Sequence, residues 1–417
     1  MSKKSLLISL LTGMSLLSFT AFSCTNLIVT KGASKDGSVM ITYAADSHTR
    51  YGALFFYPGK RNPAGSMLDV FHYENGRLMG QIPEVPVTFT VIGFMNERQV
   101  AIGEDTWGGL DSLSSQPGAI LDYGSLMKIG LQRSGSAREM IRVMTDLVST
   151  YGYSTSGESF AISDPDEAWI LELIGKGKYE KGAVWVARRV PDGYVSGHAN
   201  QARITRFPFQ KKNDWNNLNQ DCYHSPDVIS FAKDHGFYKG SDAGFSFSDV
   251  YNPLNFGGAR FCDARIWSFF RKVSVEIRNS QAYTDYALGK LQRNPGYPDG
   301  SVNPANFVTN RLPLWVKPDS LVSLPEVMAA MRDHYEDTPM EMRDGLGAGP
   351  YASPYRWRPM EFTIDSVTYL HERAIATQQT GYVFVAQSRS WLPDPVGGIF
   401  WFGVDDADGW LVAPVDC

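Results

Sequence analysis

The chain has 417 residues, with 39 basic and 44 acidic side chains and a formal net charge of −5. This length suffices for one large domain or two ordinary ones with a full hydrophobic core. The acidic balance and the absence of an arginine- or lysine-rich run exclude a conventional nucleic-acid-binding surface. Four cysteines are too few to staple a chain of this length, so packing has to provide its stability.

Residues 1–23 have the features of a secretion signal. Two lysines precede a mostly apolar run from Leu6 to Phe22, and Ala21-Phe22-Ser23 is a small-x-small cleavage sequence. Cleavage there makes Cys24 the first residue of a mature chain, 24–417. We therefore expect an exported protein, either periplasmic or extracellular. Beyond the signal, no apolar run approaches the roughly 20 residues that a membrane span requires.

After Cys24, short apolar runs alternate with turn sequences, which predicts β-hairpins. The turn-rich segment Lys31–Gly37 joins the first two runs, and the second run ends in the polar cluster Ala45–Arg50. Because a hairpin folds the end of its second strand back toward the start of its first, Asp46 is a candidate neighbour of Cys24. Strands are expected at Cys24–Thr30, Ser38–Ala44, Val87–Phe94 and Gln99–Gly103.

The rest of the chain combines helices with further hairpins. Ser136 and Glu139 fit a capping box before apolar residues at helical spacing, which predicts a helix over Ser136–Tyr151. The same capping pattern starts a predicted helix at Ser323–Tyr335, and another is expected near Asp263–Val273. Later strands are expected at Ser159–Ser163, Ala168–Ile174, Ala183–Ala187, Tyr194–Ala199, Tyr382–Ser388 and Gly398–Val404. Hairpins separated by helices, without a regular βαβ alternation, predict one α+β domain.

Cys24 is the strongest candidate for chemistry. At a new N-terminus, a cysteine carries a thiol and an α-amine on adjacent carbons, so one residue supplies both nucleophile and general base. Such an amine titrates at about 7.7 to 8.0, which lets it take the thiol proton and later give it to a leaving amine. The alternatives are a buried structural cysteine and a lipoprotein cysteine, whose amine would be acylated.

The sequence after Cys24 favours a nucleophile over a lipid anchor. Lipoprotein cysteines are normally followed by a flexible polar tether, whereas here a strand begins at once with Thr25–Val29. A residue at the head of a strand is held rigidly, as near-attack geometry requires. A protein anchored by lipid to the cell envelope, which binds peptides or glycans through its many aromatic residues, stays open as the non-enzymatic alternative.

Six blocks of sequence, spread over nearly the whole mature chain, carry a family resemblance. They are Cys24-Thr25-Asn26, Gly32–Ser38, Ala45-Asp46-Ser47, Met95–Glu104, His198–Ile204 and Gly397–Gly403. They closely resemble the dipeptidase A-type cysteine peptidases, which are N-terminal nucleophile (Ntn) hydrolases related to penicillin V acylases and bile-salt hydrolases. The resemblance implies an α+β fold of the four-layer αββα Ntn-hydrolase type. It also implies hydrolysis of short peptides, above all dipeptides, without a metal ion or organic cofactor.

The same resemblance suggests a role for each candidate site residue. Cys24 matches the nucleophile, and Asp46 matches the acid that holds the α-amine. Asn200 matches an asparagine that helps to position the amine and the oxyanion region. Arg265 is the best match to a later active-site arginine, with the neighbouring Arg260 as an alternative. Ordinary structural roles stay open for the acid, the amide and the arginine: a turn cap, a strand-end hydrogen bond and an ion pair.

Two positions depart from the acylase pattern. Tyr43 stands where the acylases have an arginine that stabilises the thiolate, and His48 or Arg50 would have to replace that cation. Thr106 stands where the acylases have an asparagine that donates to the oxyanion, so a hydroxyl or a backbone amide would have to serve. Losing one oxyanion donor typically costs about 100-fold or more in rate, so we expect some donor in that place.

Other catalytic and binding motifs are absent or weak. The sequence has no His-Glu-x-x-His, no Gly-x-Ser-x-Gly and no Gly-x-Gly-x-x-Gly that opens a helix after a strand. A zinc peptidase, a serine hydrolase and a dinucleotide-binding protein therefore lack support. The acidic run Asp405–Asp408 has some of the composition of a calcium loop, but such runs are usually only solvated.

Three further points stay open at this stage. If Cys24 is reserved for chemistry, Cys222 with Cys262 is the least strained disulfide, although the sequence does not decide whether it forms. An acylase of the penicillin V or bile-salt type would use the same centre as a dipeptidase. The sequence also leaves a homo-oligomer open.

Overall fold

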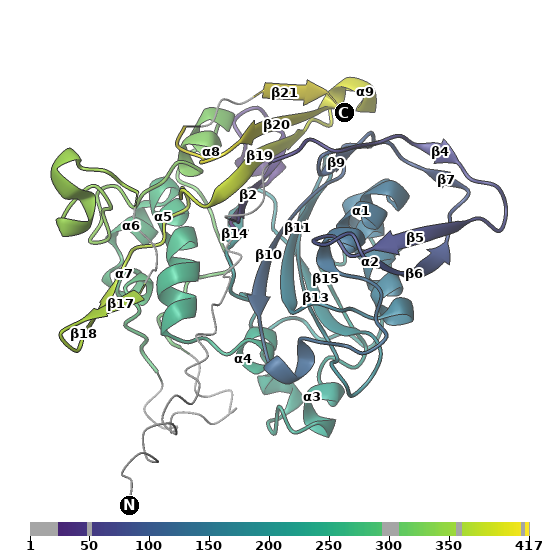
Figure 1. Cartoon of the computed structure of the whole chain (residues 1–417), viewed down its shortest axis with the longest axis horizontal. Coiled ribbons are helices and arrows are strands. Elements are labelled where there is room, and N and C mark those ends of the chain that lie inside the picture. The colour runs from purple at the N-terminus through teal and green to yellow at the C-terminus, as the bar shows by residue number, and fades with distance from the viewer. Residues whose placement is uncertain (1–23, 48–51, 294–307, 356–360, 410–412, 417) are drawn as a thin grey trace, which may run out of the picture.

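Two large antiparallel sheets form the centre of the structure (Figure 1). This computed structural model describes residues 24–47, 52–293, 308–355, 361–409 and 413–416. One sheet has seven strands in the order β16-β14-β1-β2-β19-β20-β21. These strands are β1 (Asn26–Val29), β2 (Val39–Asp46), β14 (Val195–His198), β16 (Trp315–Val316), β19 (Thr380–Ser388), β20 (Gly398–Val404) and β21 (Ala413–Asp416).

The other large sheet has eight strands in the order β15-β13-β12-β11-β10-β9-β8-β3. They are β3 (Phe56–Tyr57), β8 (Val91–Ile92), β9 (Met95–Asn96), β10 (Ala101–Gly108), β11 (Gly157–Ser163), β12 (Ala168–Gly175), β13 (Ala183–Arg189) and β15 (Cys222–His224). Three two-stranded sheets join β4 (Lys60–Arg61) to β7 (Val87–Thr88), β5 (Met67–Phe71) to β6 (Leu78–Pro83), and β17 (Glu361–Ile364) to β18 (Val367–Leu370).

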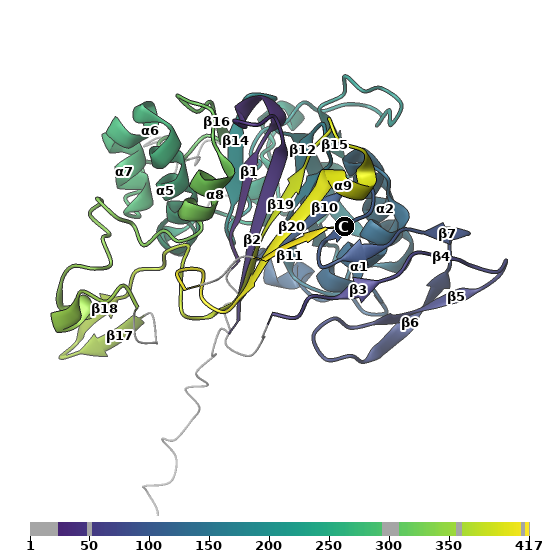
Figure 2. The same cartoon turned by 90° about the horizontal axis from the view of Figure 1, so that it is seen from above.

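Helices lie on both sides of the paired sheets (Figure 2). The α-helices are α1 (Tyr123–Arg133), α2 (Ala137–Tyr151), α3 (Ser230–Asp234), α4 (Phe247–Tyr251), α5 (Ala264–Val273), α6 (Val275–Asn279), α7 (Gln281–Ala287), α8 (Leu324–Ala330) and α9 (Asp394–Gly397). A π-helical turn, η4 (Gly258–Asp263), leads directly into α5. Short 3₁₀ segments are η1 (Lys31–Ala33), η2 (Asp111–Leu113), η3 (Asp242–Gly244) and η6 (Leu346–Tyr351).

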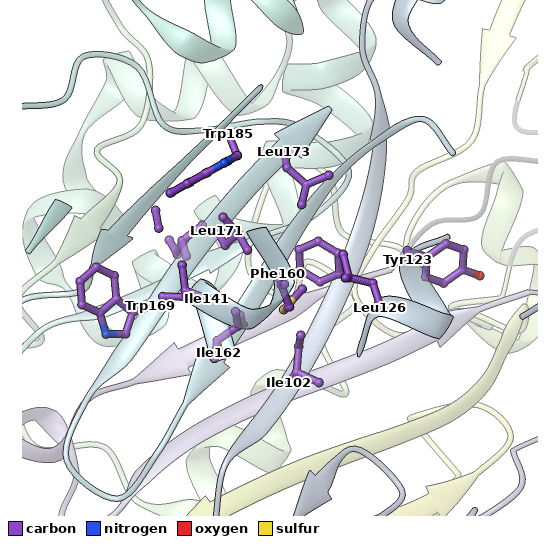
Figure 3. Packing of buried hydrophobic residues seen from close by; sticks show 14 of the residues in the cluster. Ile102, Tyr123, Leu126, Ile141, Phe160, Ile162, Trp169, Leu171, Leu173 and Trp185 are labelled. Atoms are coloured by element: carbon purple, nitrogen blue, oxygen red, sulfur yellow. The ribbon is translucent and has the colours of Figure 1, made fainter. Parts of the chain in front are cut away.

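Helices α1 and α2 cover one face of the eight-stranded sheet and form a hydrophobic core with it. Figure 3 shows Leu126 of α1 and Ile141 of α2 beside Ile102, Phe160 and Ile162 from the sheet, all fully buried. Burial of each such side chain contributes roughly 1.5 to 3 kcal/mol. This core holds β10 and β11 in fixed positions, so polar side chains on these strands are held with them.

The two large sheets approach each other closely at Gly103 of β10. A β-carbon at this position would lie 2.2 Å from Oδ1 of Asn26 and 3.1 Å from the carbonyl oxygen of Thr42. Only a glycine therefore allows β10 to lie this close to β1 and β2. The next residue along β10, Glu104, is in this way brought near the start of β1.

The predicted helix caps are confirmed, with differences in detail. Ser136 accepts a hydrogen bond from the backbone of Glu139 at 3.2 Å, but the Glu139 carboxylate binds the backbone of Gly135 instead of that of Ser136. At α8 both bonds of the Ser323–Glu326 capping box are present. That helix ends at Ala330, short of the predicted end at Tyr335, which has φ = 63° and donates from its hydroxyl to the carbonyl of Arg373.

Two strand predictions need correction. The predicted strand Val87–Phe94 is divided into β7 and β8, because β7 pairs with β4 whereas β8 pairs with β3 and β9. The strand predicted at Gln99–Gly103 begins later, at Ala101, because Gln99 adopts a left-handed turn conformation with φ = 60°. It then continues to Gly108. The α+β class is confirmed by the mixture of helices with antiparallel sheets.

The disulfide considered between Cys222 and Cys262 is not formed. Both cysteines are free thiols; Cys222 lies on the edge strand β15 of the eight-stranded sheet, and Cys262 lies in the π-helical turn before α5. The signal sequence, His48 and Arg50 lie outside the described residues. Within the described part of the chain, no helix is long and apolar enough to cross a membrane.

Candidate active site

The thiol of Cys24 lies where β2 of one sheet meets β10 of the other. An antiparallel bridge between Thr25 and Ala44 extends the pairing of β1 with β2 to this point. Cys24 is 5% exposed, with Sγ 3.5 Å from the hydroxyl of Tyr43 and 3.8 Å from Oε1 of Glu104. A backbone hydrogen bond from Asp46 also reaches the thiol. The hairpin therefore brings Asp46 next to Cys24.

The surroundings of Cys24 keep its thiol protonated at neutral pH. Burial raises the pKa of the thiol well above its usual value, and the carboxyl groups of Glu104 and Asp46 raise it further. The hydrogen bond between the thiol and the Tyr43 hydroxyl and the one from the backbone of Asp46 lower the pKa, but by less. Since the thiolate is the nucleophilic form, this thiol needs a base to become reactive.

Asp46 is held by two partners at the end of β2. Its carboxylate accepts hydrogen bonds from Arg373 and, at 2.5 Å, from the hydroxyl of Thr380 on the neighbouring strand β19. Burial raises the pKa of Asp46, and Arg373 and Thr380 oppose this rise. Arg373 was not predicted, because no motif surrounds it in the sequence. Its guanidinium is fully buried and provides the nearest positive charge to Asp46.

Arg265 of α5 ties several backbone segments of the site together. Its Nη1 donates to the carbonyl of Cys24 and to the hydroxyl of Thr25, both at 2.7 Å. Its Nη2 donates to the carbonyl of Ala199 at 3.1 Å and to Oδ1 of Asn200 at 2.8 Å. The alternative, Arg260, instead forms an ion pair with Glu372 at 2.5 Å. The structure thus brings Arg265, and not Arg260, to Cys24.

Asn200 follows β14 in a left-handed conformation with φ = 59°. Its backbone N–H donates to Asp105 at 2.9 Å, and its side-chain amide donates to the carbonyl of Thr106 at 2.7 Å. Asp105 also forms a buried hydrogen bond with His198, the last residue of β14. These contacts fix Asn200 between β10 and Arg265, in the same cluster as Cys24.

At the two positions that depart from the acylase pattern, Thr106 binds a carboxyl group and Tyr43 contacts the thiol. The hydroxyl of Thr106 donates its proton to Oε1 of Glu158 at 2.8 Å. Tyr43 contacts the thiol with a neutral hydroxyl, which also donates to Glu104. Its ring packs edge to face on Phe94 at a centroid distance of 5.9 Å.

Sequence reasoning missed the interacting acids Glu104 of β10 and Glu158 of β11. Burial and the neighbouring Glu104 raise the pKa of Glu158 well above its usual value. Two interacting buried carboxyl groups do not both ionise readily, so this environment favours the protonated form of Glu158. The available signal was the pair Glu104-Asp105 inside an otherwise apolar strand.

A cavity of about 210 Å³ is lined in part by Phe94, whose ring packs on Tyr43. Its walls are largely apolar and aromatic, with Lys128 and His72 among the polar residues. The Nζ of Lys128 lies 4.0 Å from the centroid of the Tyr57 ring. Cys24 does not line this cavity. Among the described residues, no group of three or more histidine, cysteine or acidic side chains is placed to hold a metal ion.

Comparison with known proteins identifies the family. The pattern of peptidase family C69 matches residues 51–416. The chain belongs to this family. It is therefore a cysteine-type peptidase, which confirms the predicted enzyme class and the resemblance. The matched range includes Thr106, Asn200 and Arg265, and it begins after Cys24 and Asp46.

Named relatives of this C69 peptidase are similar over most of its length. A probable dipeptidase of Latilactobacillus sakei is 24% identical over 408 residues, covering 91% of this chain and 71% of the relative. A probable dipeptidase of Salmonella dublin is 23% identical and covers 90% of this chain and 77% of the relative. Probable dipeptidase A of Streptococcus pyogenes serotype M3 is 28% identical, with 86% and 71% covered. These relatives support a peptidase or dipeptidase function.

Proposed function

We propose that this C69 peptidase is an exported dipeptidase whose nucleophile is the thiol of Cys24. Removal of residues 1–23 would expose the α-amine of Cys24 and so complete the catalytic group. The observation that carries the proposal is the Arg265 network. One buried guanidinium binds the carbonyl of Cys24 and the side chain of Asn200 together, and so holds the first mature residue rigidly.

The proposed reaction begins with transfer of the thiol proton to the α-amine of Cys24. The thiolate attacks the carbonyl carbon of the scissile peptide bond, and the oxygen of that carbonyl becomes an oxyanion. The carbon–nitrogen bond then breaks, and the leaving amine takes the proton from the α-ammonium group. A thioester on Cys24 is left. Water adds to this thioester, the carbon–sulfur bond breaks, and the free acid and the thiol are released.

Asp46 is the proposed anchor of the α-amine. Its carboxylate lies beside Cys24 and already accepts from Arg373 and Thr380. An ionised carboxylate has about four lone-pair sites, so two bonds leave acceptor capacity for an ammonium group. The carboxylate would in this way keep the amine close to Sγ and stabilise it when it is protonated.

Asn200 is a better candidate than Thr106 for the oxyanion region. The Thr106 hydroxyl donates to Glu158, whereas Asn200 is held by Arg265 and by the carbonyl of Thr106 next to the Cys24 backbone. A fixed amide is preorganised and does not need to reorient when the oxyanion forms. We therefore assign the oxyanion position to the space beside Asn200.

The proposal includes the fold and the location of the mature protein. We assign residues 24–417 to one Ntn-hydrolase domain, in which the two large sheets lie between helical layers as an αββα sandwich. The packing of α1 and α2 on one sheet and of α5 against β14 of the other supports this assignment. Residues 1–23 would act as the signal that exports the protein to the periplasm or the exterior.

A single substitution tests this function. Mature protein and its Cys24→Ala variant are compared on a panel of dipeptides, alongside penicillin V and conjugated bile salts. We expect the mature protein to hydrolyse dipeptides and the variant to be folded but inactive. Dipeptide turnover by the variant would refute the mechanism. Turnover of penicillin V or bile salts, without turnover of dipeptides, would show an acylase instead.

A further inference from the structure

The cavity of about 210 Å³ has no part in the mechanism above, and Cys24 does not line it. It lies between helix α1 and strands β3, β5 and β8. Aliphatic side chains and five aromatic ones form most of its wall, and the aromatic residues are Phe55, Tyr57, Phe71, Tyr73 and Phe94. Since an apolar cavity of about 150 Å³ accepts benzene, this cavity accommodates one aromatic ring with a few further atoms.

Two of the aromatic side chains that line the cavity are also exposed to solvent. Phe55 is 41% exposed and Phe71 is 50% exposed. The ring of Phe55 stacks on that of Tyr57, with 6.2 Å between the ring centroids and 11° between the planes. Exposed aromatic surface around a concave apolar site is typical of ligand-binding sites. A bound aromatic ring would cover part of this surface and gain ring-to-ring contacts.

Lys128 of α1 brings an amino group to the wall of the cavity. Its Nζ lies 4.0 Å from the centroid of the Tyr57 ring, and no acid in the described part of the chain forms an ion pair with it. The nearby Glu84 is instead paired with Lys60 at 2.9 Å and lies 3.9 Å from Arg133. Burial, and then the charge of Lys60, lower the pKa of Lys128, whereas Glu84 opposes this change. A carboxylate bound beside Nζ would favour the charged form of the amine.

Other polar side chains on the wall already have partners within the chain. The carboxylate of Asp69 accepts a hydrogen bond from Gln81 at 2.7 Å, and it is exposed, so that water screens its charge. Nδ1 of His72 accepts from the backbone two residues later at 3.2 Å, and Ser125 belongs to the cap of α1. Lys128 is therefore the side chain on this wall that is best placed to bind an anionic group.

We propose that this cavity binds a small carboxylic acid that carries an aromatic ring, and that Lys128 binds the carboxylate. The volume and the aromatic walls select a single ring, and the amino group selects an anion over a neutral compound through a charge-assisted hydrogen bond. The inference goes beyond the proposed function and does not rest on it, because no step of the proposed reaction uses Lys128 or this cavity.

The first test measures the binding of two compounds to the unmodified protein by isothermal titration calorimetry. They are phenylpropionate and phenylpropanol, which share the ring and the chain but differ in charge. We expect the Kd of the acid to be roughly 10- to 100-fold lower than that of the alcohol, as for one hydrogen bond to a charged group. Equal Kd values for the two compounds, or no binding of the acid, would refute the inference.

The second test uses Lys128→Met, with Lys31→Met as the matched control. Lys31 carries the same charge, but it pairs with Asp166 at 2.9 Å and does not line the cavity. We expect Lys128→Met to bind the alcohol as before and to lose the preference for the acid, and Lys31→Met to retain that preference. An unchanged preference in Lys128→Met, or an equal loss in both variants, would contradict the inference. Loss of both compounds from Lys128→Met would show that Lys128 shapes the cavity instead of binding the carboxylate, which would also refute it.

Discussion

Substitution of Arg265 by lysine tests how far the site depends on one guanidinium. Arg265 donates five hydrogen bonds from three nitrogens, to three carbonyl oxygens and to the side chains of Thr25 and Asn200. A lysine keeps the charge but has one nitrogen with three hydrogens, so at least two buried acceptors lose their donor. Each such loss costs about 1 to 3 kcal/mol, which gives a loss of about 2 to 6 kcal/mol in the free energy of unfolding.

The same substitution should also affect the rate. Because Arg265 holds the carbonyl of Cys24, we expect the thiol to lose its fixed position and kcat for a dipeptide to fall about 100-fold. The assay is steady-state hydrolysis beside a chemical denaturation curve. Arg260→Lys is the matched control, since that arginine forms one ion pair with Glu372 and should change kcat little. Normal kcat in Arg265→Lys, or an equal loss in both variants, would contradict this reasoning.

Three further outcomes are expected. Tyr43→Phe removes a hydrogen bond that lowers the pKa of the Cys24 thiol, so the rise of kcat/KM with pH should move to higher pH; an unchanged profile would argue against a role for Tyr43. Burial raises the pKa of Glu172 to about 8, above the roughly 4.3 of an unfolded chain. The contribution of Glu172 to the free energy of unfolding is therefore fully present below pH ~4 and is lost as the pH rises from about 4 to about 8. Melting curves at pH 5 and 8 should show a smaller decrease for Glu172→Gln than for the unmodified protein. Alkylation after unfolding without reductant should label both Cys222 and Cys262, and protection of the pair would show a disulfide.

Local rules predicted much of the fold. The periodic apolar residues and the caps at Ser136 and Ser323 indicated α2 and α8, because capping depends on residues three positions apart. The predicted end of α8 was wrong, because Tyr335 lies outside the helix and its hydroxyl binds the carbonyl of Arg373, which is distant in the sequence. The division of the Val87–Phe94 run also depends on which distant strands each part meets.

In the candidate site, too, local contacts could be predicted from the sequence and contacts between distant residues could not. The hairpin from β1 to β2 predicted that Asp46 lies near Cys24, because the two positions are joined by a short connection. Glu104 and Arg373 were missed, because they are 80 and 327 residues from their partners Cys24 and Asp46. No single-sequence pattern specifies such contacts. The resemblance supplied Arg265, and the structure distinguishes it from Arg260.

The central claim is that Cys24 becomes the first residue of the mature chain and forms a thioester with the substrate. The most direct test is acid quenching of the exported protein during dipeptide turnover, followed by trypsin digestion and mass spectrometry. We expect a peptide 24–31 that begins at Cys24 and carries the acyl group of the N-terminal residue of the substrate. An adduct on another peptide, or a diacylglyceryl group on Cys24, would contradict the account.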